Sequence, residues 1–93
     1  MEPHVFVIDD DQAVRESLGL LLKSMDQPAR LFDSAQAFLD QFTPDLNGCI
    51  VLDIRMPGMS GMELQQRLKA MRCTIPVIFL TGHGDVPMAV EAM

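Results

Sequence analysis

Short apolar runs alternate with amphipathic segments along the chain of 93 residues. Four runs, at 5–8, 29–32, 49–52 and 75–80, predict strands, and their lack of regular polar alternation is typical of strands buried on both faces of a parallel sheet. After each of the first three runs, apolar residues recur at spacings of three and four, which predicts an amphipathic helix. The three apolar stripes are Val14, Leu18, Leu21, Leu22 and Met25, then Ala35, Phe38, Leu39 and Phe42, then Leu64, Leu68 and Met71.

A fourth helix is predicted after the last apolar run. Asp85 is a suitable N-cap residue, and Pro87 fits the first turn. The resulting order, four strands each followed by a helix, predicts right-handed crossovers and an α/β fold with a doubly wound parallel sheet. No linker, repeat or low-complexity segment interrupts this order, so residues 1–93 are predicted to form one compact unit.

Acidic residues outnumber basic ones by 13 to 7, which gives a net charge of −6 at pH 7. This balance argues against nucleic-acid binding by a basic surface of this segment. The sequence has neither an apolar stretch long enough to span a membrane nor the features of a signal peptide, and we expect a cytoplasmic location. Cys49 and Cys73 lack metal-ligand spacing and are predicted to be reduced thiols in the core.

Oxygen-bearing side chains follow three of the predicted strands. Asp9, Asp10 and Asp11 come after the first, Asp53 after the third and Thr81 after the fourth. The carboxyl ends of parallel strands meet at one edge of the sheet, where such folds bind ligands. Clustered carboxylates repel one another unless they share a cation such as Mg²⁺, and a carboxylate can attack phosphorus. The set therefore predicts magnesium-dependent phosphoryl transfer, although the three consecutive acids taken alone fit a solvated turn and helix cap equally well.

Two segments resemble motifs of response-regulator receiver domains. Residues 7–11, Val-Ile-Asp-Asp-Asp, resemble the acidic motif that ends the first strand of this family, and residues 52–61 resemble its phosphorylation-site motif, with Met-Pro and then Ser-Gly after an aspartate. Thr81 and Gly82 are similar to the switch hydroxyl and the small residue after it. Residues 80–90 resemble the FixJ class (FixJ/NarL). The resemblance spans the whole chain and implies a flavodoxin-like sheet of strand order 2-1-3-4-5.

The resemblance also implies a role for each site residue. Asp53 would be the phosphoacceptor, and Asp10, Asp53 and the backbone carbonyl of Arg55 would bind Mg²⁺. Asp9 would act through a metal-bound water, and Thr81 would hydrogen-bond the phosphoryl group. These roles belong to a signalling domain that catalyses only its own phosphorylation and dephosphorylation, and not to a turnover enzyme.

The partners follow from the same resemblance. A sensor histidine kinase would supply the phosphoryl group, and phosphorylation would favour a homodimer. DNA would be bound only by a LuxR-type helix-turn-helix domain downstream of residue 93, so that the whole protein would regulate transcription.

Receiver domains also have a lysine at the end of the fifth strand, which residues 1–93 do not supply, because Lys23 and Lys69 lie within helix patterns. We therefore expect residues 1–93 to be a receiver that stops before its fifth strand and fifth helix. The fourth strand would then be an exposed apolar edge of the sheet, and we expect this fragment to self-associate or exchange segments.

Two other functions fit parts of the sequence. A magnesium phosphatase of the haloacid-dehalogenase type would use Asp9 as nucleophile, but Ala13 stands where its motif needs threonine and Asp53 is left unexplained. A phosphate-independent interaction module would not need the complete set of acids. His83 is interpreted as a loop residue that tunes partner contacts.

Overall fold

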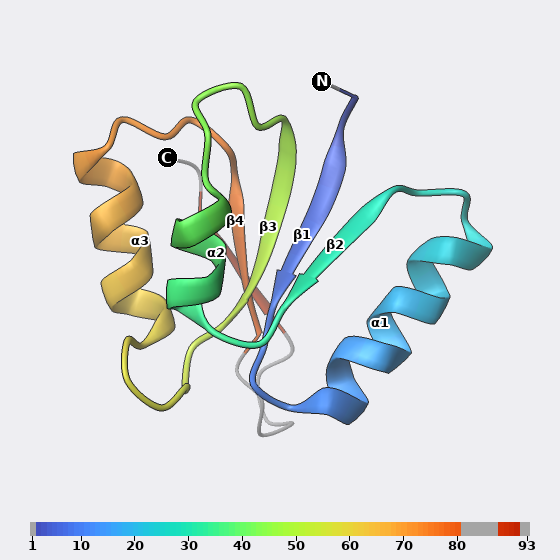
Figure 1. Ribbon diagram of the computed structural model, residues 1–93. Helices are drawn as coiled ribbons and strands as arrows, with labels where there is room; N and C mark the ends of the chain where they lie inside the picture. Colours follow the sequence, from blue (N-terminus) through green and yellow to red (C-terminus); the bar gives the residue numbers. More distant parts are fainter. Residues whose placement is uncertain (1, 81–87, 92–93) are drawn as a thin grey trace.

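Strands and helices alternate through most of the chain in the computed structural model, which describes residues 2–80 and 88–91 (Figure 1). The elements are β1 (His4–Ile8), α1 (Gln12–Ser24), β2 (Ala29–Phe32), α2 (Ala35–Gln41), β3 (Gly48–Asp53), α3 (Gly61–Ala70), β4 (Val77–Leu80) and β5 (Met88–Glu91). The first seven elements occur in the predicted order. No helix in the described part of the chain has the length and apolar character needed to cross a membrane.

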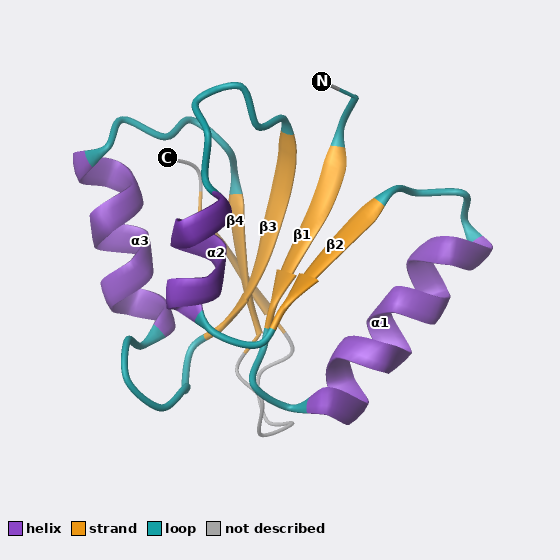
Figure 2. Cartoon of the chain, in the orientation of Figure 1, coloured by secondary structure: helices purple, strands orange, loops and turns teal. Residues whose placement is uncertain are grey.

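The strands form a single sheet in the order β2-β1-β3-β4-β5. The first four strands are parallel, and Val7 of β1, for example, lies opposite Leu31 of β2 and Val51 of β3. Figure 2 shows how these strands run side by side, so that their carboxyl ends gather at one edge of the sheet. The predicted fold class, strand order and parallel sheet are therefore confirmed.

The prediction of a fourth helix is wrong, because Met88–Glu91 is a strand. This strand, β5, runs antiparallel to β4, with Glu91 opposite Val77 and Met88 opposite Leu80. The fifth strand expected to be missing is thus replaced by an antiparallel one, and β4 is not an open edge. An unpaired strand edge leaves backbone N–H and C=O groups open, and pairing with Met88–Glu91 gives those of β4 partners. Because β4 is paired, its exposed edge is no longer a reason to expect self-association of residues 1–93. Self-association stays a prediction.

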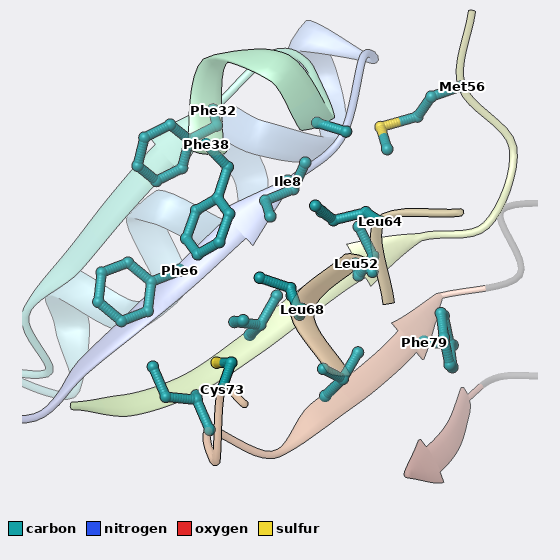
Figure 3. Close-up of a cluster of buried hydrophobic side chains, with 14 residues drawn as sticks. Phe6, Ile8, Phe32, Phe38, Leu52, Met56, Leu64, Leu68, Cys73 and Phe79 are labelled. Carbon is teal, nitrogen blue, oxygen red and sulfur yellow. The ribbon is translucent and has the colours of Figure 1, made fainter. Parts of the chain in front are cut away.

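One face of the sheet packs against α2 and α3. Alternate strand residues point to this face, and Phe6, Ile8, Ile50 and Leu52 are completely buried there with Phe38 of α2. Figure 3 shows this cluster, in which the rings of Phe6 and Phe32 meet Phe38 edge to face at 5.8 and 5.3 Å. Cys73 lies in the same cluster, as predicted for a core thiol.

The opposite face is covered by α1, and the covering is incomplete. No residue of α1 is buried, and Leu21 and Met25, which the apolar stripe predicts to face the core, are 55% and 65% exposed. The helix lies toward the outer strand β2, where Gly19 packs against the side chain of Leu31. An open hollow of about 350 Å³ remains between the first half of α1 and Leu80. The inward prediction also fails for Met71, which is exposed at the end of α3.

Candidate functional site

The turn after β1 is held by a chain of backbone and carboxylate hydrogen bonds. The Asp9 N–H donates to the carbonyl of Phe32 at 3.1 Å, and the Asp11 N–H donates to Oδ1 of Asp9 at 2.9 Å. Asp11 is the N-cap of α1, since its own Oδ1 accepts from the N–H groups of Ala13 and Val14. Asp11 is thus the helix cap among the three consecutive acids, and its Oδ1 is already bound by the first turn of α1.

Arg15 adds a contact that the sequence analysis missed. Its Nη1 donates to the backbone carbonyl of Asp9 at 2.8 Å, from one turn inside α1. The available signal was an arginine in the first part of a helix that follows three acids. Periodicity places it next to the apolar stripe, so pattern alone does not distinguish it from a solvated cation.

Asp53 is the last residue of β3 and is only 7% exposed. Its Oδ1 accepts a hydrogen bond of 3.2 Å from the N–H of Arg55, whose side chain is exposed. The chain then returns to start α3, and the Gly61 N–H donates to the carbonyl of Ile54. A Cβ atom on Gly61 would lie 2.3 Å from the carbonyl oxygen of Asp53, so only glycine allows this close approach.

The start of α3 has its own support. Ser60 caps the helix and forms a capping box with Glu63, in which each side chain accepts from the other's backbone N–H. This arrangement satisfies donors that a helix N-terminus otherwise leaves unpaired. The Met-Pro-Gly-Met segment before it is thereby fixed at both ends.

Three carboxylates from these two turns meet at the carboxyl edge of the sheet. Oxygen atoms of Asp9, Asp10 and Asp53 all lie within 4.8 Å of one another, and Asp10 is the exposed member. Burial, together with the charges of Asp9 and Asp10, raises the pKa of Asp53 to about 6, despite the hydrogen bond from Arg55. Burial is also the main cause of a raised pKa at Asp9. Without a cation, these groups are held closer together than their charges favour.

The donor set fits a small hard cation. Mg²⁺ prefers oxygen ligands at about 2.0–2.1 Å and keeps several waters, so two or three carboxylates are sufficient. Carboxylate oxygens that all lie within 4.8 Å of one another are near enough for one such ion to be shared between them. Cys49 and Cys73 are not in this group.

Two predicted residues lie outside the described part of the chain, namely Thr81 and His83. The structure thus brings together Asp9, Asp10 and Asp53, with the Arg55 backbone beside them. Coordination by the Arg55 carbonyl stays a prediction.

Comparison with known proteins gives a consistent result. The family model described as the response regulator receiver domain matches residues 5–93 of this chain. The transcriptional regulatory protein FixJ of Bradyrhizobium diazoefficiens is 54% identical over 90 residues, which are 97% of this chain and 44% of that protein. FixJ of Azorhizobium caulinodans is 57% identical over 89 residues, 96% of this chain and 42% of that protein. The chain therefore spans less than half the length of these curated relatives.

Solved structures agree in fold. The response regulator StyR superposes with a TM-score of 0.87 and 53% identity, over 100% of this chain and 47% of that one. The structure named FixJ-N gives a TM-score of 0.80 and 44% identity, over 94% of this chain and 70% of that one.

Proposed function

Since this chain belongs to the response-regulator receiver domain family, we propose that Asp53 accepts a phosphoryl group from a phosphohistidine of a sensor kinase. The observation that carries the proposal is the cluster of Asp9, Asp10 and Asp53, in which a nearly buried carboxylate at a strand end is flanked by two others. The domain is a signalling domain and not a metabolic enzyme. Its own phosphorylation and dephosphorylation are the chemistry that we assign to it.

In the proposed reaction an oxygen of Asp53 attacks phosphorus, the bond from phosphorus to the histidine nitrogen breaks, and the imidazole leaves. The N–H of Arg55 holds one carboxylate oxygen and so orients the group for attack. Asp10, Asp53 and the backbone carbonyl of Arg55 would hold a magnesium ion, and Asp9 would act on it through a water. When bound, Mg²⁺ would offset the negative charge of the phosphoryl oxygens.

The product carries more negative charge at Asp53, which is the signal that the rest of the protein reads. An aspartyl-phosphate has a charge of about −1.5 to −2 in place of about −1. We assign Thr81 as the hydroxyl that contacts the phosphoryl group. We further propose a cytoplasmic regulator that dimerises on phosphorylation and binds DNA through a LuxR-type domain beyond residue 93, a proposal that the names of the FixJ relatives support.

The two alternatives from the sequence are not favoured. A haloacid-dehalogenase-type phosphatase would need Asp9 as nucleophile, but Ala13 stands where its motif needs threonine, and Asp53 would have no role in it. An interaction module without phosphate chemistry leaves the carboxylate cluster unexplained. The family match over residues 5–93 accounts for both acidic motifs together.

The direct test is phosphorylation of the full-length protein by acetyl phosphate with Mg²⁺, read by intact mass. We expect a transient gain of one phosphoryl group, absent without Mg²⁺ and absent in Asp53→Asn. Asp40→Asn, which changes an exposed aspartate of α2, is the matched control and is expected to label normally. Labelling that persists in Asp53→Asn, or repeated turnover of a phosphomonoester, contradicts the proposal.

A further inference from the structure

Arg15 stands where helix electrostatics disfavours a cation. It is the fourth residue of α1, whose first turn contains no acidic residue, and the positive end of the helix dipole lies beside it. A position that breaks a local rule is expected to have a reason outside the helix. That reason is the hydrogen bond of 2.8 Å from its Nη1 to the carbonyl oxygen of Asp9.

The Asp9 carbonyl lies just beyond the end of β1. β1 ends at Ile8, and although the Asp9 N–H still donates to β2, its carbonyl points to α1 instead of to a strand. A partly buried carbonyl needs a donor, and a guanidinium supplies a short, charge-assisted hydrogen bond. Arg15 therefore supplies the donor that a neighbouring strand would otherwise supply, at the point where β1 ends and the acidic turn begins.

This hydrogen bond determines the direction of the next residue. The Asp9 carbonyl belongs to the same planar peptide unit as the N–H of Asp10, so holding the carbonyl fixes the plane from which Asp10 departs. Asp9 itself is held through its N–H, by Phe32, and through its Oδ1, by the N–H of Asp11. Arg15 holds Asp9 at a third point, its backbone carbonyl. The peptide held in this way orients Asp10, the exposed member of the cluster.

We infer that Arg15 is a positioning residue for the magnesium site: by holding the Asp9–Asp10 peptide, it keeps both carboxylates in reach of one ion shared with Asp53. The inference rests on the proposed function, because it concerns the affinity of the same site. Partners that orient metal ligands without touching the metal typically change metal affinity by about 10- to 100-fold.

Positioning and plain electrostatics predict opposite signs. Arg15 is a positive charge near a site for a divalent cation, so removing that charge alone would strengthen Mg²⁺ binding. Loss of positioning would weaken it. A purely structural role in α1 would lower stability and leave the Mg²⁺ affinity of the folded protein unchanged.

The experiment measures Mg²⁺ affinity in the full-length protein by displacement of Mn²⁺, followed by electron paramagnetic resonance. For Arg15→Met, which keeps the length of the side chain, we expect a Kd about tenfold weaker than that of the unchanged protein. Lys23→Met removes a cation about two turns further along α1 and is the matched control, with a Kd expected within about twofold because solvent screens that charge. Urea unfolding of each variant separates affinity from stability.

A native or tighter Kd for folded Arg15→Met overturns the inference, while Mg²⁺ binding and Asp53 phosphorylation in the unchanged protein leave the proposed function standing. Absence of Mg²⁺ binding by the unchanged protein overturns both. If Arg15→Met does not fold, Arg15→Lys decides, since its compact ammonium keeps the charge but not the guanidinium geometry. A Kd about threefold weaker then supports positioning, and a native Kd overturns it.

Discussion

The two faces of the sheet are covered unequally. Toward α2 and α3, the strand residues Phe6, Ile50 and Leu52 have no exposed surface, and they form one apolar cluster with both helices. Toward α1, Val7 is buried but Val51 and Ile78 are only half-buried. No residue of α1 is buried.

The face under α2 and α3 contributes most to stability, whereas the candidate site lies at the edge of the other face. The cluster under α2 and α3 contains nearly all of the buried apolar residues in the described part of the chain, so most of the stabilisation from apolar burial is on this face. In the alternation of β3, Asp53 belongs with Cys49 and Val51, on the side of α1. Asp53 therefore lies at the edge of the open face, away from the cluster that α2 and α3 cover. Substitutions on the two faces are expected to differ accordingly.

The largest effect is expected in the well-packed face. Phe38→Ala removes a completely buried ring that contacts three other phenylalanines, and should lower the free energy of unfolding by about 3–5 kcal/mol. Urea denaturation measures this. Phe42→Ala, at the half-buried end of the same helix, is the control and should cost clearly less. Equal losses would show that the cluster is not centred on Phe38.

The next effect concerns the buried carboxylate at the edge of the open face. The pKa of Asp53 is about 6 in the folded protein and 3.8 in the reference state, so its charged form is disfavoured by folding. In metal-free protein, stability should therefore fall as pH rises from about 4 through 6, and the cost persists above that range.

Asp53→Asn removes this cost and should raise the free energy of unfolding at pH 8 by about 2–3 kcal/mol, with little change at pH 4. Denaturation at the two pH values measures the difference. Asp40→Asn on the exposed side of α2 provides the control. A variant that is less stable than the unchanged protein at pH 8 would contradict the electrostatic picture of the site.

A smaller effect is expected within the open face. Leu18→Ala shortens a half-buried side chain of α1 beside the hollow at Leu80, and should cost about 1 kcal/mol. The comparison with Phe38→Ala in the same denaturation series tests the inequality of the two faces. A loss as large as that of Phe38→Ala would mean that α1 is packed as firmly as α2.

The smallest effect is expected at Leu20, which is 69% exposed on α1. Leu20→Ser should change the free energy of unfolding by no more than about 0.5 kcal/mol, because little apolar surface is buried there. Thermal unfolding is sufficient to detect a deviation. A larger loss would place Leu20 in a contact that the exposure does not indicate.

The sequence predicted the parallel sheet and most of the site, because both depend on local signals. The apolar runs at β1 and β3 end in acids, and parallel strands bring such ends together whatever the details of packing. Asp9, Asp10 and Asp53 were predicted for this reason and meet as expected.

What was missed depends on contacts between distant segments. The stripe through Leu21 and Met25 is a regular helical stripe, but burial needs a partner surface, and α1 lies toward the outer strand. β5 forms where propensity favoured a helix because β4 had an edge to pair. Arg15 acts through a backbone carbonyl, a contact that leaves no mark in a pattern of residue types.

The turn at Asp9–Asp11 makes the site and the first turn of α1 a single unit. Asp11 caps the helix and donates its N–H to Asp9, so fraying of the helix end also releases the ligand carboxylate. Because α1 has no buried residue, this local opening should cost far less than global unfolding and should appear as fast amide hydrogen exchange at Ala13 and Val14. A bound divalent cation would slow that exchange. Hydrogen exchange in the first turn of α1 would then report whether the site is occupied, although the helix does not contact the ion.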